Sequence, residues 1–317
     1  MENDSSRSRR TFKDYLGITA RGFCMGIADV VPGVSGGTMA FILGVYEELL
    51  DAVHAVNARF LRSLVSFRFT EALDRFPYRF VIALVTGIMV AIFSLARFFA
   101  WALAHHPVYV WAFFFGLVLA SIFTVRRKVT TWTATEALAV LLAAAAAFVL
   151  VGAVPVETPT AAWFVFLSGT IAICAMILPG ISGSFILVIM GKYEYMLHAV
   201  VERDFLPIII FGCGGILGLI FFARVLRWLL RRYHDLTVAA LIGLMAGSLR
   251  KIWPWKETVE TFTDRQGAVK PLIQQNVLPA SVSEEVLLAV ALGITGCAIV
   301  LLIERFAARR SAEKTED

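Results

Sequence analysis

Two short stretches of the chain carry residues that could bind an anion, and each combines proline, glycine and serine. One reads Pro-Gly-Val-Ser-Gly-Gly-Thr from Pro32, and the other reads Pro-Gly-Ile-Ser-Gly-Ser from Pro179. A proline ends one helix, and a serine favours the start of the next, whose first backbone N–H groups have no partner within the helix. These groups lie at the positive end of the helix dipole and bind anions. We therefore predict an anion site to which both stretches contribute the following residues: Ser35, Gly36, Gly37, Thr38, Ser182, Gly183 and Ser184.

A purely structural role is the alternative for these residues. Ser35 and Ser182 would then only cap helices, and the glycines would only let helices pack closely. The presence of two such stretches in one chain favours the anion site.

Two arginines within apolar stretches, Arg97 and Arg224, could supply positive charge to this site. The planar guanidinium group suits a phosphate, and an arginine within lipid normally faces a partner or a cavity. Both arginines also lie late in their apolar stretches, so the alternative is that their side chains extend to lipid head groups.

Three carboxylates, Asp29, Glu47 and Glu194, are candidates for carrying protons or for pairing with the arginines. Asp29 lies three residues before Pro32 and is the first candidate for a proton site. Glu47 and Glu194 form the second candidate, with a surface location at a hairpin end as their alternative.

The composition shows which elements must position these residues. The chain has 317 residues, of which 59% are apolar and 17% charged, against about 25% charged residues in soluble domains. The apolar residues form long blocks, and the mean hydropathy is +0.77. This excludes an ordinary soluble enzyme and predicts a mainly α-helical polytopic membrane protein. The four cysteines lie in apolar stretches without paired spacing, so we expect neither disulfides nor a metal site, and we expect no cleaved signal peptide.

Six apolar stretches are predicted to span the membrane: 79–104, 107–125, 134–154, 205–230, 236–250 and 284–304. Two longer apolar regions, 14–55 and 160–200, are each broken near the middle by one of the Pro-Gly stretches, which predicts two broken re-entrant helical hairpins. The remaining segments are predicted to lie outside the membrane: a basic N-terminus (1–13), a basic connector (56–78), a polar loop (251–283) and a C-terminal tail (305–317).

The chain also contains an internal sequence repeat. Residues 22–53 align without a gap on residues 169–200, at an offset of 147, and later matches such as Gly87 with Gly214 follow an offset of 127. Two repeats result, 14–154 and 155–304, each with one hairpin and three spans. An odd number of crossings would turn the second repeat upside down, which is the inverted-repeat design of many secondary transporters. On that topology most Lys and Arg residues fall on the side of both termini, which the positive-inside rule makes cytoplasmic.

These motifs resemble a known family. The pattern G-x-A-D-x-V-P-G-V-S-G-G-T from Gly26, the G-x-Y-E that follows from Gly44, and the second P-G-I-S-G-S with G-K-Y-E from Gly191 are similar to the DUF368 membrane proteins. That resemblance implies a polyprenyl-phosphate (undecaprenyl-phosphate) translocase of the bacterial cytoplasmic membrane, which returns the lipid carrier of envelope synthesis to the inner leaflet. It also implies the lipid as partner. Moving a phosphate inward opposes a potential that is negative inside, so we further expect proton coupling. We expect no cofactor and no nucleic acid partner.

Two other functions remain open from the residues alone. A carrier or channel for a small anion would use the same helix N-termini, and an intramembrane lipid-phosphate enzyme could use Ser35 or Asp29 chemically. Motifs of metal, nucleophile-elbow and phosphate-loop enzymes are missing, so we expect no catalytic residues. The oligomeric state cannot be inferred from the sequence.

Overall fold

The computed structural model describes residues 10–30, 35–56, 60, 62–63, 66–68, 70–71, 73, 76–153, 156, 158–263 and 269–316. Pro32 and Gly33 of the first Pro-Gly stretch, and much of the predicted connector 56–78, lie outside this part of the chain.

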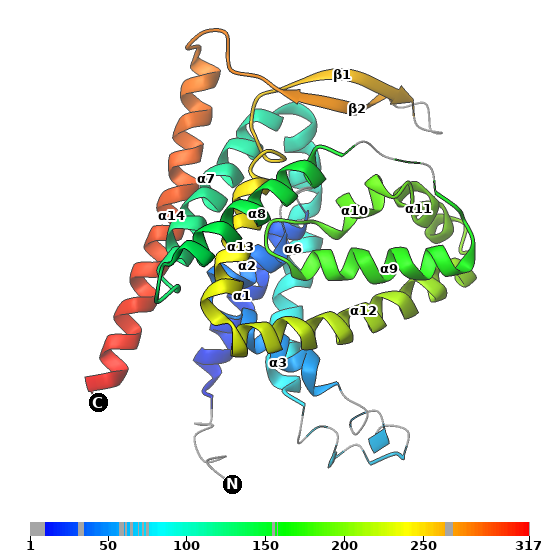
Figure 1. Ribbon diagram of the computed structural model, residues 1–317, viewed down its shortest axis with the longest axis vertical. Helices are drawn as coiled ribbons and strands as arrows, with labels where there is room; N and C mark the ends of the chain where they lie inside the picture. Colours follow the sequence, from blue (N-terminus) through cyan, green and yellow to red (C-terminus); the bar gives the residue numbers. More distant parts are fainter. Residues whose placement is uncertain are drawn as a thin grey trace.

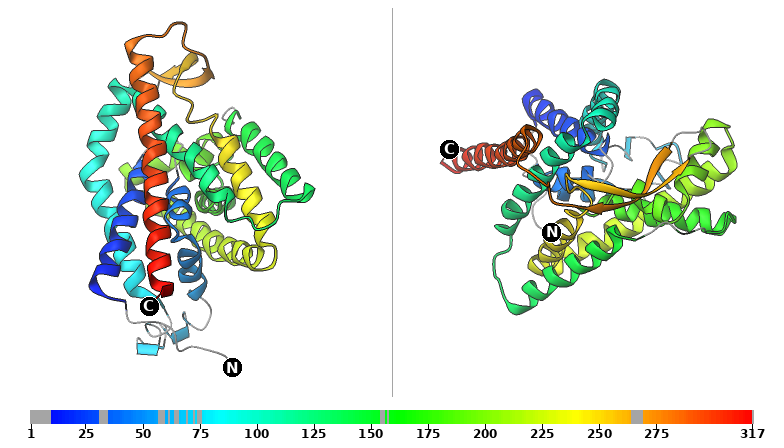
Figure 2. Two further views of the ribbon diagram at one scale, coloured as in Figure 1. Left: turned by 90° about the vertical axis from the view of Figure 1, so that its left-hand side faces the viewer. Right: turned by 90° about the horizontal axis from the view of Figure 1, so that it is seen from above.

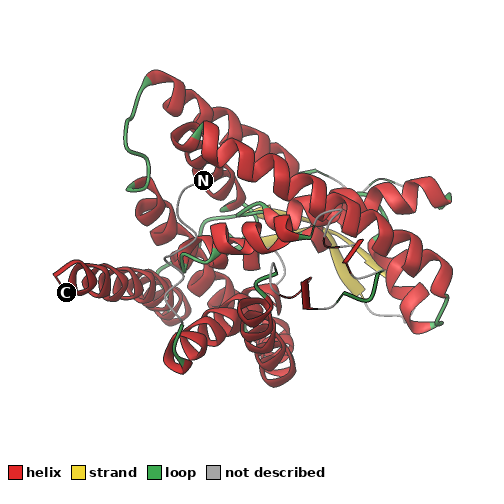
Figure 3. Ribbon diagram, turned by 90° about the horizontal axis from the view of Figure 1, so that it is seen from below, coloured by secondary structure: helices red, strands yellow, loops and turns green. Residues whose placement is uncertain are grey.

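The described residues form twelve helices and one two-stranded sheet, and helices dominate the view in Figure 3. The helices of the first repeat are α1 (Phe12–Val30), α2 (Gly36–Ile42), α3 (Tyr46–Ala55), α6 (Tyr78–His105), α7 (Pro107–Arg126) and α8 (Ala134–Val151). Those of the second are α9 (Ala162–Ile177), α10 (Gly183–Ile189), α11 (Tyr193–Val201), α12 (Phe205–Arg232), α13 (His234–Ser248) and α14 (Glu284–Glu316). Strands β1 (Lys256–Thr263) and β2 (Val269–Asn276) pair antiparallel.

Five helices are long and apolar enough to cross a membrane: α6, α7, α8, α12 and the part of α14 from Glu284 to Arg305. They confirm five of the six predicted spans and the prediction of a polytopic membrane protein. The span predicted at 236–250 is the shorter α13, whose 15 residues reach about 22 Å at 1.5 Å per residue, less than the hydrocarbon thickness. Only 11% of the apolar window of α8 is buried inside the protein, so most of this helix is left to face lipid.

Each predicted hairpin contains three helices, so a single break near the middle was too simple a prediction. The second hairpin bends by 108° between α10 and α11, in addition to its break after α9. Gly44 and Gly191 follow α2 and α10 with φ of 71° and 58°, which side chains with a Cβ rarely adopt. The next residue donates back five positions in both repeats, from Val45 N to Ala40 O and from Lys192 N to Leu187 O. This geometry is a glycine C-terminal cap, and it explains why a glycine precedes Tyr-Glu in both motifs.

The long helices pack in pairs that repeat between the two halves. Helix α1 packs on α6 and α9 on α12, while α7 packs on α14 and α8 on α13 (Figures 1 and 2). A Cβ on Gly22 would collide with the carbonyl of Leu84, and one on Gly169 with that of Phe211. Leu84 and Phe211 are themselves matched at the offset of 127, so equivalent glycines allow equivalent crossings. The repeat therefore extends to helix packing, and its inversion across a membrane stays a prediction.

The two ends of the bundle are distinct. Helix α1 begins and α14 leaves the bundle at one end, and the β-hairpin lies at the other (Figure 1). Helix α7 runs from one end to the other. In its second turn Trp111 contacts Lys256 of β1, and just beyond its last turn Arg127 pairs with Glu304 of α14. We call these the hairpin end and the terminus end. The sequence predicted only a polar loop at 251–283, and so missed the sheet, because its strands lack a clear alternation of apolar and polar residues.

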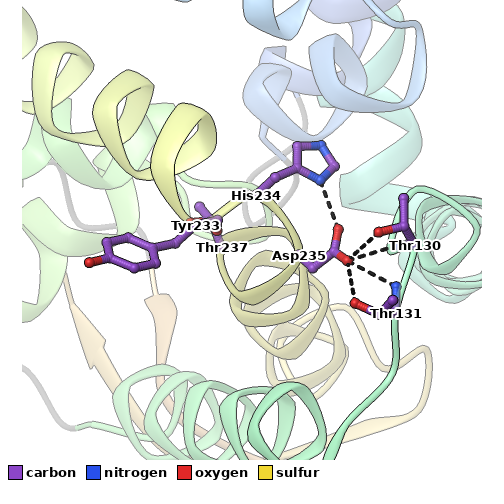
Figure 4. A network of polar contacts seen from close by, with 6 residues as sticks. All are labelled: Thr130, Thr131, Tyr233, His234, Asp235 and Thr237. Carbon is purple, nitrogen blue, oxygen red and sulfur yellow. Dashed lines mark hydrogen bonds and ion pairs between the residues drawn. The ribbon is translucent and has the colours of Figure 1, made fainter.

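At the terminus end, hydrogen bonds to Asp235 join the connection between α7 and α8 to the start of α13 (Figure 4). Its carboxylate accepts hydrogen bonds from the backbone N–H and the hydroxyl of both Thr130 and Thr131, at 2.6 to 3.1 Å. The Nδ1 atom of His234 lies 3.0 Å from the other carboxylate oxygen of Asp235. The network joins the α7–α8 connection of the first repeat to α13 of the second.

Candidate functional site

The break between α9 and α10 contacts the first turns of α2 and α3. The Ser35 hydroxyl donates to the carbonyl of Met176 at 3.1 Å, and the Gly180 N–H donates to the Thr38 hydroxyl at 2.8 Å. The Tyr46 hydroxyl adds a bond of 3.1 Å to the carbonyl of Ile177. These bonds join segments more than 130 residues apart. Residues that follow the first Pro-Gly pair therefore lie directly against the end of α9 and the second Pro-Gly stretch.

At the first break, the donors that were predicted to bind an anion have partners within the protein. The Gly36 N–H donates to a carboxylate oxygen of Asp29 at 2.8 Å, and the Gly37 N–H donates to the Ser35 hydroxyl at 3.1 Å. The Thr38 N–H donates to the Ser35 carbonyl at 2.9 Å. Ser35 and Thr38 are buried, whereas Asp29 is exposed. The first N–H group of α2 thus already has a partner, which is the carboxyl group of Asp29.

The second break is more open. Met176 stands at the repeat position of Asp29, so no carboxylate occupies the equivalent place beside Gly183. Ser182 makes no side-chain cap, and its hydroxyl lies 2.8 Å from that of Ser184, which is exposed. Of the two halves of the predicted anion site, this one is available to a ligand in the structure.

Arg97 and Arg224 lie on outward faces of α6 and α12. Arg97 follows the exposed Phe93 by one turn and precedes the exposed Trp101 by another. Arg224 has Trp228 one turn further along the same exposed face. The structure therefore places neither arginine inward, and within its described part no hydrogen bond or ion pair joins either to a protein group.

The two glutamates differ in their surroundings although both are exposed in the first turns of α3 and α11. Glu47 faces Lys128, whose pKa is lowered by burial, and the negative charge of Glu47 offsets part of that shift. Glu194 lines a cavity of about 590 Å³ together with Lys192. The Lys192 ammonium group is buried and donates to the carbonyl of Thr158 at 2.7 Å.

Two lysines beside the short helices were missed by the sequence comparison. The Nζ atom of Lys128 lies 4.7 Å from the ring centroid of Phe41 in α2, and that of Lys251 lies 4.4 Å from that of Phe185 in α10. Each lysine follows the second long helix of its repeat, α7 or α13. They are 123 positions apart, so the offset of 127 did not pair them. The nearby match of Ser121 with Ser248 was the one signal that could have revealed this relation.

Comparisons with known proteins identify the family. A family model described as undecaprenyl phosphate translocase-like matches residues 25–270, which include both breaks and both lysines. The chain belongs to this translocase-like family. Among its relatives, a polyprenyl-phosphate transporter of Vibrio cholerae is 40% identical over 300 residues, covering 93% of this chain and 97% of that protein. A polyprenyl-phosphate transporter of Staphylococcus aureus is 30% identical over 252 residues, covering 74% of this chain and 84% of that protein. No solved structure matches.

Membership of the translocase-like family confirms the resemblance seen in the motifs. The matched residues run from α1 to β2 and leave out α14. In this family member, the described residues hold no group of three or more His, Cys, Asp or Glu side chains arranged to bind a metal ion.

Proposed function

We propose that this chain moves polyprenyl phosphate, such as undecaprenyl phosphate, from the outer to the inner leaflet of a bacterial cytoplasmic membrane. The observation that carries the proposal is the 40% identity along nearly its whole length with a protein named polyprenyl-phosphate transporter. The two joined breaks support it, because irregular backbone within a membrane is tolerated where it is buried in protein or lines a cavity.

The head-group phosphate would bind first at the open second break, to the hydroxyls of Ser182 and Ser184 and to the first N–H groups of α10. Access to Ser35–Thr38 requires Asp29 to leave the Gly36 N–H. Arg97 and Arg224, which face outward, would meet the phosphate as the lipid approaches from the bilayer. The prenyl tail need not enter the protein and can stay in the bilayer.

Charge makes the inward direction costly. A phosphate monoester carries about −1.5 to −2 charges near pH 7. Against a potential that is negative inside, two charges cost roughly 4–5 kcal/mol per 100 mV. A proton carried inward reduces this cost without a second ion site. Asp29 is our first candidate for the proton site, because protonation weakens its hold on the Gly36 N–H and frees that donor for the substrate; Glu47 and Glu194 are the second.

The topology proposal has both termini in the cytoplasm and two inverted repeats. The charge distribution supports it, as does the position of the α1 start and the α14 end at the same end of the bundle (Figure 1). On this proposal the hairpin end faces the outside of the cell.

The test is reconstitution of the full-length protein in vesicles with a fluorescent polyprenyl phosphate in both leaflets. The proposal predicts that the protein accelerates exchange of the intact lipid between leaflets, read as loss of protection from a membrane-impermeant quencher. Release of inorganic phosphate from the lipid would indicate an enzyme instead. Transport of a small anion without any movement of the lipid would indicate an anion carrier.

A further inference from the structure

Two lysines lie together at the hairpin end, beside the open second break. Lys251 follows α13, and its Nζ atom stacks on Phe185, the residue next to Ser184. Lys256 begins β1, and its Nζ atom donates to the Lys251 carbonyl at 2.5 Å and lies 4.3 Å from the ring centroid of Trp111. Both side chains are partly buried. Residues from α7, α10, β1 and the turn after α13 thus meet at one place.

This lysine pair has no counter-charge within the described part of the chain. None of the ion pairs there involves a lysine. Glu257 is exposed and follows Lys256 along β1, so its side chain points to the opposite face of the strand. Two like charges held together in partial burial raise the free energy of the site, and a bound anion would lower it.

A hydrogen-bond donor without a partner among the described residues lies one residue before Lys256 in the sequence, on a ring that packs against Trp253. The indole N–H of Trp255, the neighbour of Lys256, is buried and has no hydrogen-bond partner within the described residues. A buried donor without a partner costs about 1–3 kcal/mol, so such donors are uncommon unless a ligand or water completes them. The two lysines themselves offer two amino groups, and a phosphate accepts hydrogen bonds from such donors.

The terminus end has a related but weaker arrangement. Lys128 stacks on Phe41 of α2 as Lys251 stacks on Phe185 of α10. Lys128 has Glu47 as an opposing charge, and among the described residues no contact places a second lysine beside it. At the hairpin end an anion therefore meets two lysines without an opposing carboxylate among the described residues, whereas at the terminus end it meets Lys128, which faces Glu47 and follows Arg126 and Arg127.

We propose that Lys251 and Lys256 form a docking site for the phosphate head group of a prenyl lipid at the hairpin end, next to Ser184, and that Lys128 forms its lower-affinity counterpart at the terminus end. This inference rests on the proposed function and adds to it the place where the substrate is captured. Glu47 competes with the phosphate for Lys128, whereas no carboxylate among the described residues does so for Lys251 and Lys256, and this difference favours capture at the hairpin end and release at the other.

The first experiment uses the unaltered full-length protein in nanodiscs. Its lysines are acylated with an amine-reactive reagent, with or without farnesyl phosphate, farnesol or inorganic phosphate, and mapped by mass spectrometry. Farnesyl phosphate should slow acylation of Lys251 and Lys256 about tenfold or more, and that of Lys13 not at all, because charge-assisted contacts hide the two amines. Farnesol should protect neither. Equal protection by inorganic phosphate would overturn the assignment to a lipid head group.

The second experiment measures farnesyl phosphate affinity and lipid exchange in variants. Lys251→Gln with Lys256→Gln should weaken binding about tenfold or more, equivalent to about 1.4 kcal/mol. Lys128→Gln should weaken it about threefold or less. Arg68→Gln, at an exposed surface ion pair, is the matched loss of one charge and should have no effect. The double change Lys251→Arg with Lys256→Arg retains both charges and should retain binding, and it substitutes for the glutamine pair if that pair does not fold.

Failure of this inference can be distinguished from failure of the proposed function. Lipid exchange by the unaltered protein, with no protection of Lys251 or Lys256 and no loss in the glutamine pair, would overturn the docking site alone. Absence of both lipid exchange and farnesyl phosphate binding in the unaltered protein would overturn the proposed function and the docking site with it.

Discussion

Asp29 accepts a hydrogen bond of 2.8 Å from the backbone N–H of Gly36, so the protein's own carboxylate occupies the start of α2. The two residues are seven positions apart, Asp29 in the last turn of α1 and Gly36 at the start of α2. A carboxylate at this place competes with any other anion for the same donor. We therefore propose that its protonation state controls whether the first N–H groups of α2 can accept a phosphate.

We expect Asp29→Asn to bind the lipid but to lose the dependence of inward transport on a proton gradient. The amide still fits beside Gly36 but cannot take up and release a proton. The measurement is lipid exchange in vesicles whose pH gradient and potential are set separately. Glu285→Gln, an exposed change in the first turn of α14, is the control and should keep the dependence. Transport indifferent to both pH and Asp29 would exclude proton coupling through this residue.

The bond between Thr38 and Gly180 should stabilise the contact between the repeats. In Thr38→Val the Gly180 N–H loses its acceptor in a buried place, which costs about 1–3 kcal/mol. Thr38→Ser keeps the hydroxyl, so its free energy of unfolding should fall by less than that of Thr38→Val. Thermal unfolding in detergent gives both values, and equal stability of the valine and serine variants would show that the bond contributes nothing.

Glycines within one helix should respond to alanine in opposite directions. A Cβ on Gly214 would collide with the Phe166 carbonyl, whereas Gly212 has no atom within 4 Å of its would-be Cβ. We expect Gly214→Ala to destabilise the protein by about 1–3 kcal/mol through overpacking. Gly212→Ala should be neutral or stabilise it by up to about 1 kcal/mol through helix propensity. A similar unfolding temperature for the two variants would contradict the packing of α9 on α12.

Lys256 should make the affinity for farnesyl phosphate depend on pH. Burial, with a smaller contribution from the charge of Lys251, lowers the pKa of Lys256 to about 7. The ammonium form is therefore lost as the pH rises through about 7, while the phosphate, with a second pKa near 6, stays a dianion. We expect farnesyl phosphate affinity to fall between about pH 6.5 and about pH 8.5, and Lys256→Gln to show a flatter profile. A slope that is unchanged in this variant would assign the titration to another group.

A separate prediction concerns the contribution of Arg97 and Arg224 to lipid-phosphate binding. Arg97→Ala and Arg224→Ala together should weaken lipid-phosphate binding about tenfold or more, because a charge-assisted bond contributes about 1.5–3 kcal/mol. Equilibrium binding in nanodiscs measures the effect, and the folded state is checked by thermal unfolding. Unchanged affinity in the folded double variant would assign both side chains to bilayer head groups, as their exposed positions beside Trp101 and Trp228 allow.

The sequence by itself determined the membrane class, five of the long helices, the repeat and the family. These features follow from consecutive residues: an apolar block long enough to cross lipid is apolar at every position, and a Pro-Gly-x-Ser-Gly stretch interrupts a helix locally. The glycine before Tyr-Glu was also visible as a motif, although its role as a helix cap became clear only from the positive φ of Gly44 and Gly191.

Only the tertiary structure decided which groups meet. It placed Asp29 on the Gly36 N–H, directed Arg97 and Arg224 outward, and brought Lys251 and Lys256 together beside Ser184 and Trp111. The direction of a side chain around a helix depends on how that helix packs against distant segments, and a similar hydropathy is compatible with an inward or an outward arginine. The partner of a buried donor is likewise set by chain folding over tens of residues, which local patterns do not record.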